Sequence, residues 1–71
     1  MAHTRRLETN QDMQEAMEQE ARIRVFQDNH VINSGGIITR FDEQLVVVQS
    51  GVSDVAYHDR SACEFYAIGK R

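Results

Sequence analysis

The chain has 71 residues, one cysteine and a formal net charge of −3, with a sequence pI near 5.5. This length allows one domain with a small core, and the single Cys63 excludes an intrachain disulfide, so oligomerisation is the expected further support. The acidic balance argues against nucleic-acid binding by bulk charge. The chain holds no segment apolar enough to cross a membrane and no signal-peptide pattern, so we expect a soluble, cytoplasmic protein.

Residues 1–9 are mostly polar and are predicted to form a flexible N-terminal tail. Arg5 and Arg6 in this tail either carry solvated charge or form an arm that contacts phosphates. Residues 10–21 are predicted to form a helix, which Thr9 or Asn10 caps. Apolar residues recur along it at helical spacing, in a narrow stripe that must pack on the rest of the domain: Met13, Ala16, Met17 and Ala21.

From residue 22 onward the pattern is that of β-strands. Ile23 and Val25 alternate with arginines in the first strand, and residues 28–30 have the composition of a turn. Four further strands are predicted, at residues 31–41, 44–49, 52–57 and 63–68. The glycine pair at 35–36 indicates a bulge or a sharp bend, and the continuous valine run predicts a third strand buried on both faces.

One helix followed by five short strands is typical of a small barrel. We therefore predict a mostly β protein, with an N-terminal α-helix followed by a small, five-stranded, strongly bent antiparallel barrel of Sm-like or SH3-like type. The predicted single domain covers residues 10–71, and its barrel covers residues 22–68. The edges of such a barrel invite pairing with another chain, and a ring closed by pairing between neighbouring copies would satisfy them.

The stretch from Gly36 to Asp42 reads Gly-Ile-Ile-Thr-Arg-Phe-Asp and leads into a valine-rich strand. This order resembles the first sequence motif of the Sm-like barrels, in particular that of the Hfq-type RNA chaperone family. The resemblance implies a ring-forming homo-oligomer, usually a hexamer, that binds single-stranded RNA in post-transcriptional regulation. In that family one face of the ring takes uridine-rich RNA and the other takes purine-rich RNA.

The resemblance also indicates which residues would contact RNA. Gln11 matches a glutamine that helps to line the family's uridine pocket, and Tyr57 falls where its second motif begins. Tyr57 and Tyr66 either stack on bases or lie at core or subunit contacts. Two arginines of the first strand are predicted to contact phosphates. The predicted RNA-binding residues are Gln11, Arg22, Arg24, Phe41, Gln44, Tyr57 and His58.

An alternative function stays open at this point, because the chain departs from the family pattern. Gln44 replaces an aromatic residue, and His58-Asp59 replaces a lysine-histidine pair, which puts a carboxylate near the phosphates. These changes and the net acidity favour a small-barrel protein-interaction or assembly module without nucleic-acid binding. No nucleophile–base arrangement and no zinc-ligand spacing is visible, so we expect no enzyme activity, no metal and no cofactor.

Overall fold

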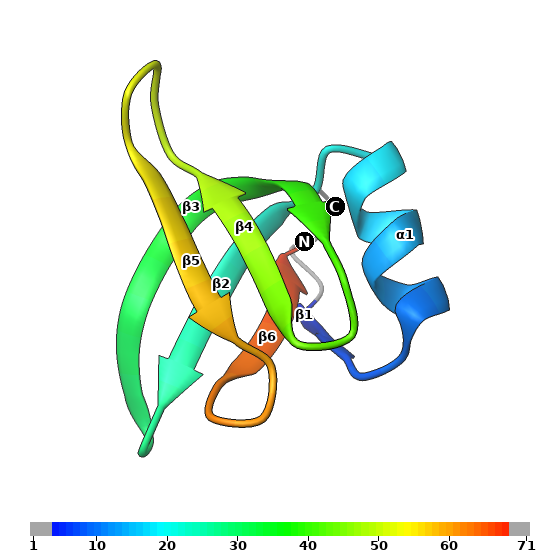
Figure 1. The fold of residues 1–71 in the computed structure, drawn as a ribbon, viewed down its shortest axis with the longest axis vertical. Helices are drawn as coiled ribbons and strands as arrows, with labels where there is room; N and C mark the ends of the chain where they lie inside the picture. Colours follow the sequence, from blue (N-terminus) through cyan, green and yellow to red (C-terminus); the bar gives the residue numbers. More distant parts are fainter. Residues whose placement is uncertain (1–3, 69–71) are drawn as a thin grey trace.

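The computed structural model describes residues 4–68. Figure 1 shows one helix beside a strongly bent antiparallel sheet. The elements in chain order are β1 (Thr4–Leu7), α1 (Asn10–Glu18), β2 (Arg22–Gln27), β3 (His30–Phe41), β4 (Leu45–Gln49), β5 (Val55–Asp59) and β6 (Glu64–Ile68). The strands form one six-stranded sheet in the order β1-β6-β2-β3-β4-β5. Since β1 and β5 are its edge strands, the sheet does not close.

The mostly β class, with a helix that precedes β2–β6, is confirmed. The predicted count of five strands is wrong, because residues 4–7 of the expected tail form β1 and pair with β6. The folded domain therefore begins before residue 10, and the helix ends at Glu18 rather than at residue 21. Residues 1–3 of the predicted tail and residues 69–71 of the predicted domain lie outside the described residues.

Helix α1 begins with a capping box. The Thr9 hydroxyl accepts a hydrogen bond from the Asp12 amide (3.0 Å), and the Asp12 carboxylate accepts one from the Thr9 amide (3.1 Å). The same carboxylate accepts from the Glu8 amide and contacts Arg5, and these bonds hold the pKa of Asp12 well below its usual range. The cap therefore fixes the short connection between β1 and α1.

Strand β3 is long because it serves both halves of the sheet. It pairs with β2 through residues 30–36 and with β4 through residues 37–41. The register against β2 shifts twice, between Ile23 and Arg24 and between Val25 and Phe26, and the register against β4 shifts once, between residues 38 and 40. Gly35 is left unpaired opposite the first shift and has a φ of +92°. The bulge predicted at the glycine pair is confirmed, and it turns β3 across the molecule (Figure 1).

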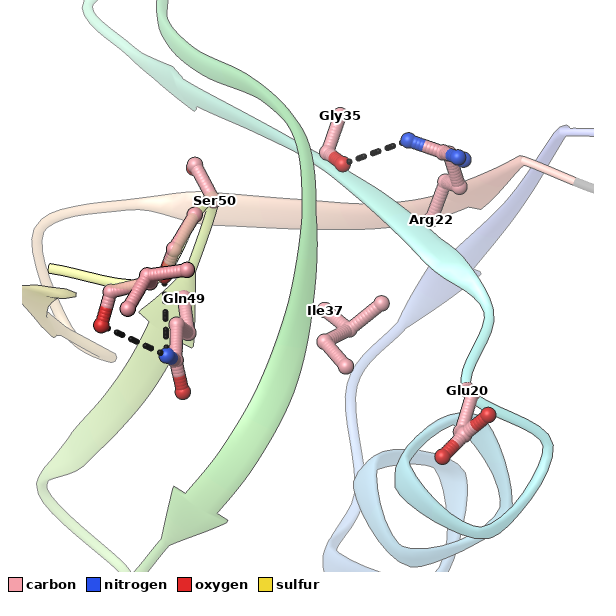
Figure 2. Close-up of a pocket in the computed structure, with 8 residues that line it drawn as sticks. Glu20, Arg22, Gly35, Ile37, Gln49 and Ser50 are labelled. Carbon is pink, nitrogen blue, oxygen red and sulfur yellow. Dashed lines mark hydrogen bonds between the residues drawn. The ribbon is translucent and has the colours of Figure 1, made fainter. Parts of the chain in front are cut away.

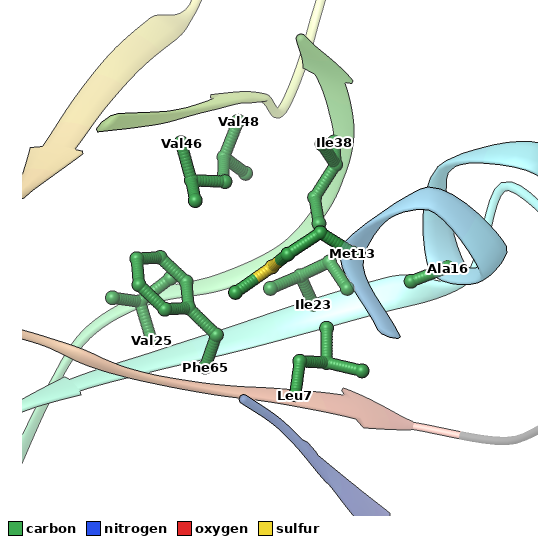
Figure 3. Packing of buried hydrophobic residues seen from close by; sticks show 9 residues of the cluster. All are labelled: Leu7, Met13, Ala16, Ile23, Val25, Ile38, Val46, Val48 and Phe65. Atoms are coloured by element: carbon green, nitrogen blue, oxygen red, sulfur yellow. The ribbon is translucent and has the colours of Figure 1, made fainter. Parts of the chain in front are cut away.

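The core lies between the bent sheet and α1. In Figure 3, Met13 reaches from the helix into the side chains of the strands. The apolar stripe of the helix is confirmed for Met13 and Ala16, which are buried, and for Met17, which packs against the core. Ala21 also packs there, but it lies beyond the end of α1. The nine buried residues are Leu7, Met13, Ala16, Ile23, Val25, Ile38, Val46, Val48 and Phe65.

Strand β4 is buried on one face only, which corrects the expectation for its valine run. Val46 and Val48 point into the core and are fully buried. Leu45 is 38% exposed, and Val47 is half-buried on the same outer face. The sheet therefore leaves apolar side chains of β4 facing outward, where no helix of residues 4–68 covers them.

Arg60 forms hydrogen bonds with three chain segments at one end of the sheet. Its guanidinium donates to the Asn10 carboxamide oxygen (2.6 Å), to the Asp42 carbonyl (2.7 Å) and to the Glu8 carbonyl (3.4 Å). These partners belong to the start of α1, the β3–β4 turn and the β1–α1 connection. The half-buried Arg60 therefore stabilises the arrangement of these three segments.

Candidate nucleic-acid interface

The outer face of β1, β6 and β2 carries a row of cationic and aromatic side chains. Phe65 points into the core, so the next residue, Tyr66, points outward. In the register of the sheet, Tyr66 lies opposite Arg6 of β1 on one side and opposite Arg24 of β2 on the other. Residues that are directly opposed in antiparallel strands share a face, so Tyr66 lies between two arginines.

A second aromatic ring supports this row. The rings of Phe26 and Tyr66 meet edge to face, with 5.4 Å between their centroids and 79° between their planes. Both residues are half-buried, so the contact holds the Tyr66 ring in place and leaves part of it open. Arg22 extends the same face along β2, since it lies two residues before Arg24. We call the set Arg6, Arg22, Arg24, Phe26 and Tyr66 the arginine–tyrosine face.

The charges on this face oppose the overall charge of the chain. The face carries three arginines and one nearby carboxylate, that of Glu64, which lies 3.9 Å from the Arg6 guanidinium. Within residues 4–68, Arg22 and Arg24 form no ion pair with a carboxylate. The acidic helix, by contrast, holds Arg5 in ion pairs on another side of the molecule. A local basic surface thus exists on a chain of net charge −3.

A shallow pocket of about 630 Å³ adjoins Arg22. Figure 2 shows the Arg22 guanidinium donating to the carbonyl of Gly35 (3.1 Å), the residue that the bulge leaves without a partner in the strand register. Glu20 and Ile37 lie below this contact, and the end of β4 forms the opposite wall at Gln49. The bond holds Arg22 at the rim of the arginine–tyrosine face.

The residues predicted from sequence do not meet in one place. Arg22 and Arg24 lie on the arginine–tyrosine face, whereas Phe41 and Tyr57 line a separate cavity of about 110 Å³ on the β4–β5 side. Gln11 lies on α1, where its amide donates to Glu15 (3.3 Å). Each of these places belongs to a different element, so a single pocket that combines them is not formed.

The turn between β3 and β4 explains Asp42 and Gln44. One Asp42 carboxylate oxygen accepts from the Gln44 and Leu45 amides, both at 2.7 Å, and these bonds lower the pKa of Asp42. Gln44 is exposed in this turn. Asp59 caps the next turn in the same way, since it accepts from the Ser61 hydroxyl and amide, which lowers its pKa. Both aspartate side chains therefore stabilise turns by accepting hydrogen bonds within them.

His58 points to the inside of the sheet, away from the face of Tyr57. Its Nε2 lies 3.1 Å from the Asn33 amide nitrogen, and its ring meets Phe65 edge to face. The Asn33 carboxamide oxygen accepts from the Ser50 hydroxyl (3.4 Å), which orients the amide nitrogen toward the imidazole. The neutral imidazole therefore accepts this bond, and burial lowers the pKa of His58.

This arrangement predicts a loss of stability in mild acid. The pKa of His58 is lower in the folded chain than the ordinary value of 6.5, so the unfolded chain binds the proton more readily. The contribution is complete above pH 6.5 and is lost as the pH falls below it. The urea midpoint should therefore be lower at pH 5.5 than at pH 7.5, and His58→Gln, which still accepts from Asn33, should reduce this difference. A wild-type midpoint that does not change over this range would contradict the prediction.

Comparison with protein-family models, with curated proteins and with solved structures finds no match. The candidate site therefore rests on the chain's own geometry. Among residues 4–68, no group of three or more His, Cys, Asp or Glu side chains is placed to hold a metal ion. No helix in the same part of the chain is long and apolar enough to cross a bilayer.

The sequence indicated part of this face but not its arrangement. Arg22 and Arg24 on the first predicted strand and Tyr66 on the last were candidates for RNA contacts, but the pattern did not place them on a common surface. Phe26 was missed, although its period-two spacing with Arg22 and Arg24 places all three on one side of a strand. The position of Arg6 had no signal in the pattern, because it depends on β1 pairing with a strand at the other end of the domain.

Proposed function

We propose that this protein is a diverged Sm-like protein that binds single-stranded RNA through the arginine–tyrosine face. The observation that carries the proposal is the row Arg6–Tyr66–Arg24 across three neighbouring strands. Proteins that bind single-stranded nucleic acids with little sequence preference use two interactions. Bases stack on aromatic rings, and positively charged side chains contact the phosphates.

The spacing of the row suits this ligand. Neighbouring strands lie about 4.8 Å apart, so the two arginines are separated by roughly 10 Å with the tyrosine between them. A base that stacks on the open part of the Tyr66 ring leaves its flanking phosphates within reach of long arginine side chains. The edge-to-face contact with Phe26 holds the ring before the ligand arrives, which reduces the ordering cost of binding.

The test is a fluorescence-anisotropy titration with labelled six-nucleotide oligo-U and oligo-A at several salt concentrations. Three arginine–phosphate contacts predict a slope of log K against log salt of about −2, or a roughly 20-fold loss of affinity from 50 to 200 mM salt. Arg24→Gln should weaken binding and make this slope shallower by about 0.7. Tyr66→Leu should weaken binding and leave the slope unchanged, because it removes stacking alone.

Each variant has a matched control on the β3–β5 half of the sheet. Arg40→Gln removes an exposed arginine of β3, and Tyr57→Leu removes an exposed tyrosine of β5. Both controls should bind as the wild type does. If Tyr57→Leu abolishes binding while Tyr66→Leu leaves it intact, the RNA site lies near the Phe41–Tyr57 cavity, as the resemblance implies. Absence of binding by the folded wild type would refute the RNA proposal altogether.

A second candidate function is a protein-interaction or assembly module without RNA binding. It is favoured by the outward apolar side chains of β4 and β5, where Val55 is 45% and Tyr57 is 69% exposed. An apolar protein contact would depend weakly on salt, whereas a phosphate contact weakens steeply. The salt series therefore separates the two functions.

A further inference from the structure

The open part of the Tyr66 ring faces β1. Phe26 belongs to β2 and meets the Tyr66 ring edge to face, so it covers the ring from the β2 side. Arg6 lies opposite Tyr66 on the other neighbour, β1, and its side chain is 50% exposed. A base that stacks on Tyr66 in the proposed function therefore lies on the β1 side of the ring, beside Arg6.

A carboxylate lies on the same side of the ring. Glu64 comes two residues before Tyr66 on β6, so the two side chains share the outer face of the sheet. The register partner of Glu64 on β2 is Phe26, the residue that the Tyr66 ring contacts, so the ring leans along β6 toward Glu64. The Glu64 carboxylate extends toward β1, because it lies 3.9 Å from the Arg6 guanidinium.

The pair Arg6–Glu64 is loose and open to solvent. Its separation of 3.9 Å is about 1 Å longer than a charge-assisted hydrogen bond, and the two side chains are 50% and 49% exposed. An exposed ion pair of this kind contributes little to folding stability. The guanidinium N–H groups and the carboxylate oxygens are therefore free to bond to a ligand at little cost to the fold.

Together the two side chains present one kind of hydrogen-bonding pattern. The guanidinium only donates, and the ionised carboxylate only accepts, through two oxygens. The ligand edge that matches has one acceptor followed by two donors. Guanine has this edge, in its O6, its N1–H and its 2-amino group.

The other three bases of RNA do not match the pair. Uracil has a carbonyl on each side of its N3–H, so one of its carbonyls would face a carboxylate oxygen. Adenine and cytosine each offer one amino donor beside a ring nitrogen that accepts, and this nitrogen would also face the carboxylate. A carboxylate beside the stacking ring therefore disfavours every base except guanine.

We propose that the base that stacks on Tyr66 is guanine, read by Glu64 and Arg6. The N1–H and the 2-amino group donate to the Glu64 carboxylate, and O6 accepts from the Arg6 guanidinium. The guanidinium has five N–H groups, so one bond to O6 leaves others for a neighbouring phosphate. This inference rests on the proposed function and adds to it a base preference at one position.

The test is the same anisotropy titration with hexanucleotides that differ at one position, at the lowest salt concentration of the series. The wild type should bind UUUGUU about tenfold more tightly than UUUUUU. UUUAUU controls for the stacking of a purine and should bind about fivefold more weakly than UUUGUU. Inosine in place of guanosine keeps O6 and N1–H but lacks the 2-amino group, so it should bind with intermediate affinity.

Glu64→Gln tests the role of the carboxylate. The substitution keeps the size of the side chain but replaces one acceptor by a donor, so the preference for UUUGUU over UUUUUU should fall to about twofold or less. Binding of UUUUUU should not weaken, because a negative charge near the phosphates is removed. Glu43→Gln is the matched control, since it makes the same change in the exposed β3–β4 turn and should keep the preference.

The outcomes separate this inference from the proposed function. Equal binding of UUUGUU and UUUAUU, equal binding of the guanosine and inosine forms, or an unchanged preference in Glu64→Gln would overturn the assignment of guanine. In each of these cases RNA binding through the arginine–tyrosine face would stand. Absence of binding to all the oligonucleotides would overturn both.

Discussion

Leu7→Ala should destabilise the protein by about 2–5 kcal/mol, since it deletes a fully buried leucine from a small core. The total stability of a domain of this size is of the order of 5 kcal/mol, so a large fraction of the molecules should be unfolded near physiological temperature. Urea unfolding followed by circular dichroism measures this loss. The result would establish that the N-terminal segment is an integral strand of the sheet.

Thr4→Ala is the control within the same strand. The side chain of Thr4 is exposed, and its backbone keeps its place opposite Ile68. Its unfolding free energy should stay within about 0.5 kcal/mol of the wild type. Equal and small effects of the two substitutions would mean that β1 does not contribute to the folded state.

Gly36→Ala should cost about 1–3 kcal/mol for a steric reason. A Cβ at this position would lie 2.5 Å from a methyl group of Val48, 2.8 Å from the Ser50 hydroxyl and 3.0 Å from the Gln49 carbonyl. Two of these neighbours are a buried core side chain and a backbone atom, so they cannot move aside without loss of packing. Gly36→Asn should lower the free energy of unfolding more than Gly36→Ala does, because its additional atoms would meet the same neighbouring residues.

The adjacent glycine gives the opposite order of effects. Gly35 has open space around its Cα, but its φ of +92° strains any residue with a Cβ. Asparagine tolerates this region better than alanine, so Gly35→Asn should destabilise less than Gly35→Ala. The same order at both positions, measured by urea unfolding, would contradict the distinction between a close approach and a backbone requirement.

The local features of the fold were predictable because each has a short-range cause. The apolar stripe of α1 reflects the 3.6-residue period, and the cap reflects hydrogen bonding within four residues of Thr9. The turn at Asp28 and Asn29 was predicted from their tolerance of positive φ, and both adopt it. The glycine bulge belongs to the same class, since paired glycines weaken a regular strand and favour a bulge or a bend at that point.

The long-range features were not predictable from pattern. Residues 4–7 carry only one apolar residue, Leu7, and no alternation over so few positions distinguishes a strand from a tail. The valine run of β4 suggested burial on both sides, but the pattern cannot show that no other element covers its outer face. The sequence pattern also did not group the residues of the candidate site. They share a surface only because β6 lies between β1 and β2 in the sheet.

The pairing of β1 with β6 joins the first described strand to the last. Residue 4 lies opposite residue 68, so β1 is synthesised long before the strand with which it pairs. Contacts of such large sequence separation slow folding and delay the completion of the core until Phe65 has been made. During synthesis the nascent chain therefore exposes Leu7 and Met13 to the cell, and this interval is when a chaperone would have the most to bind.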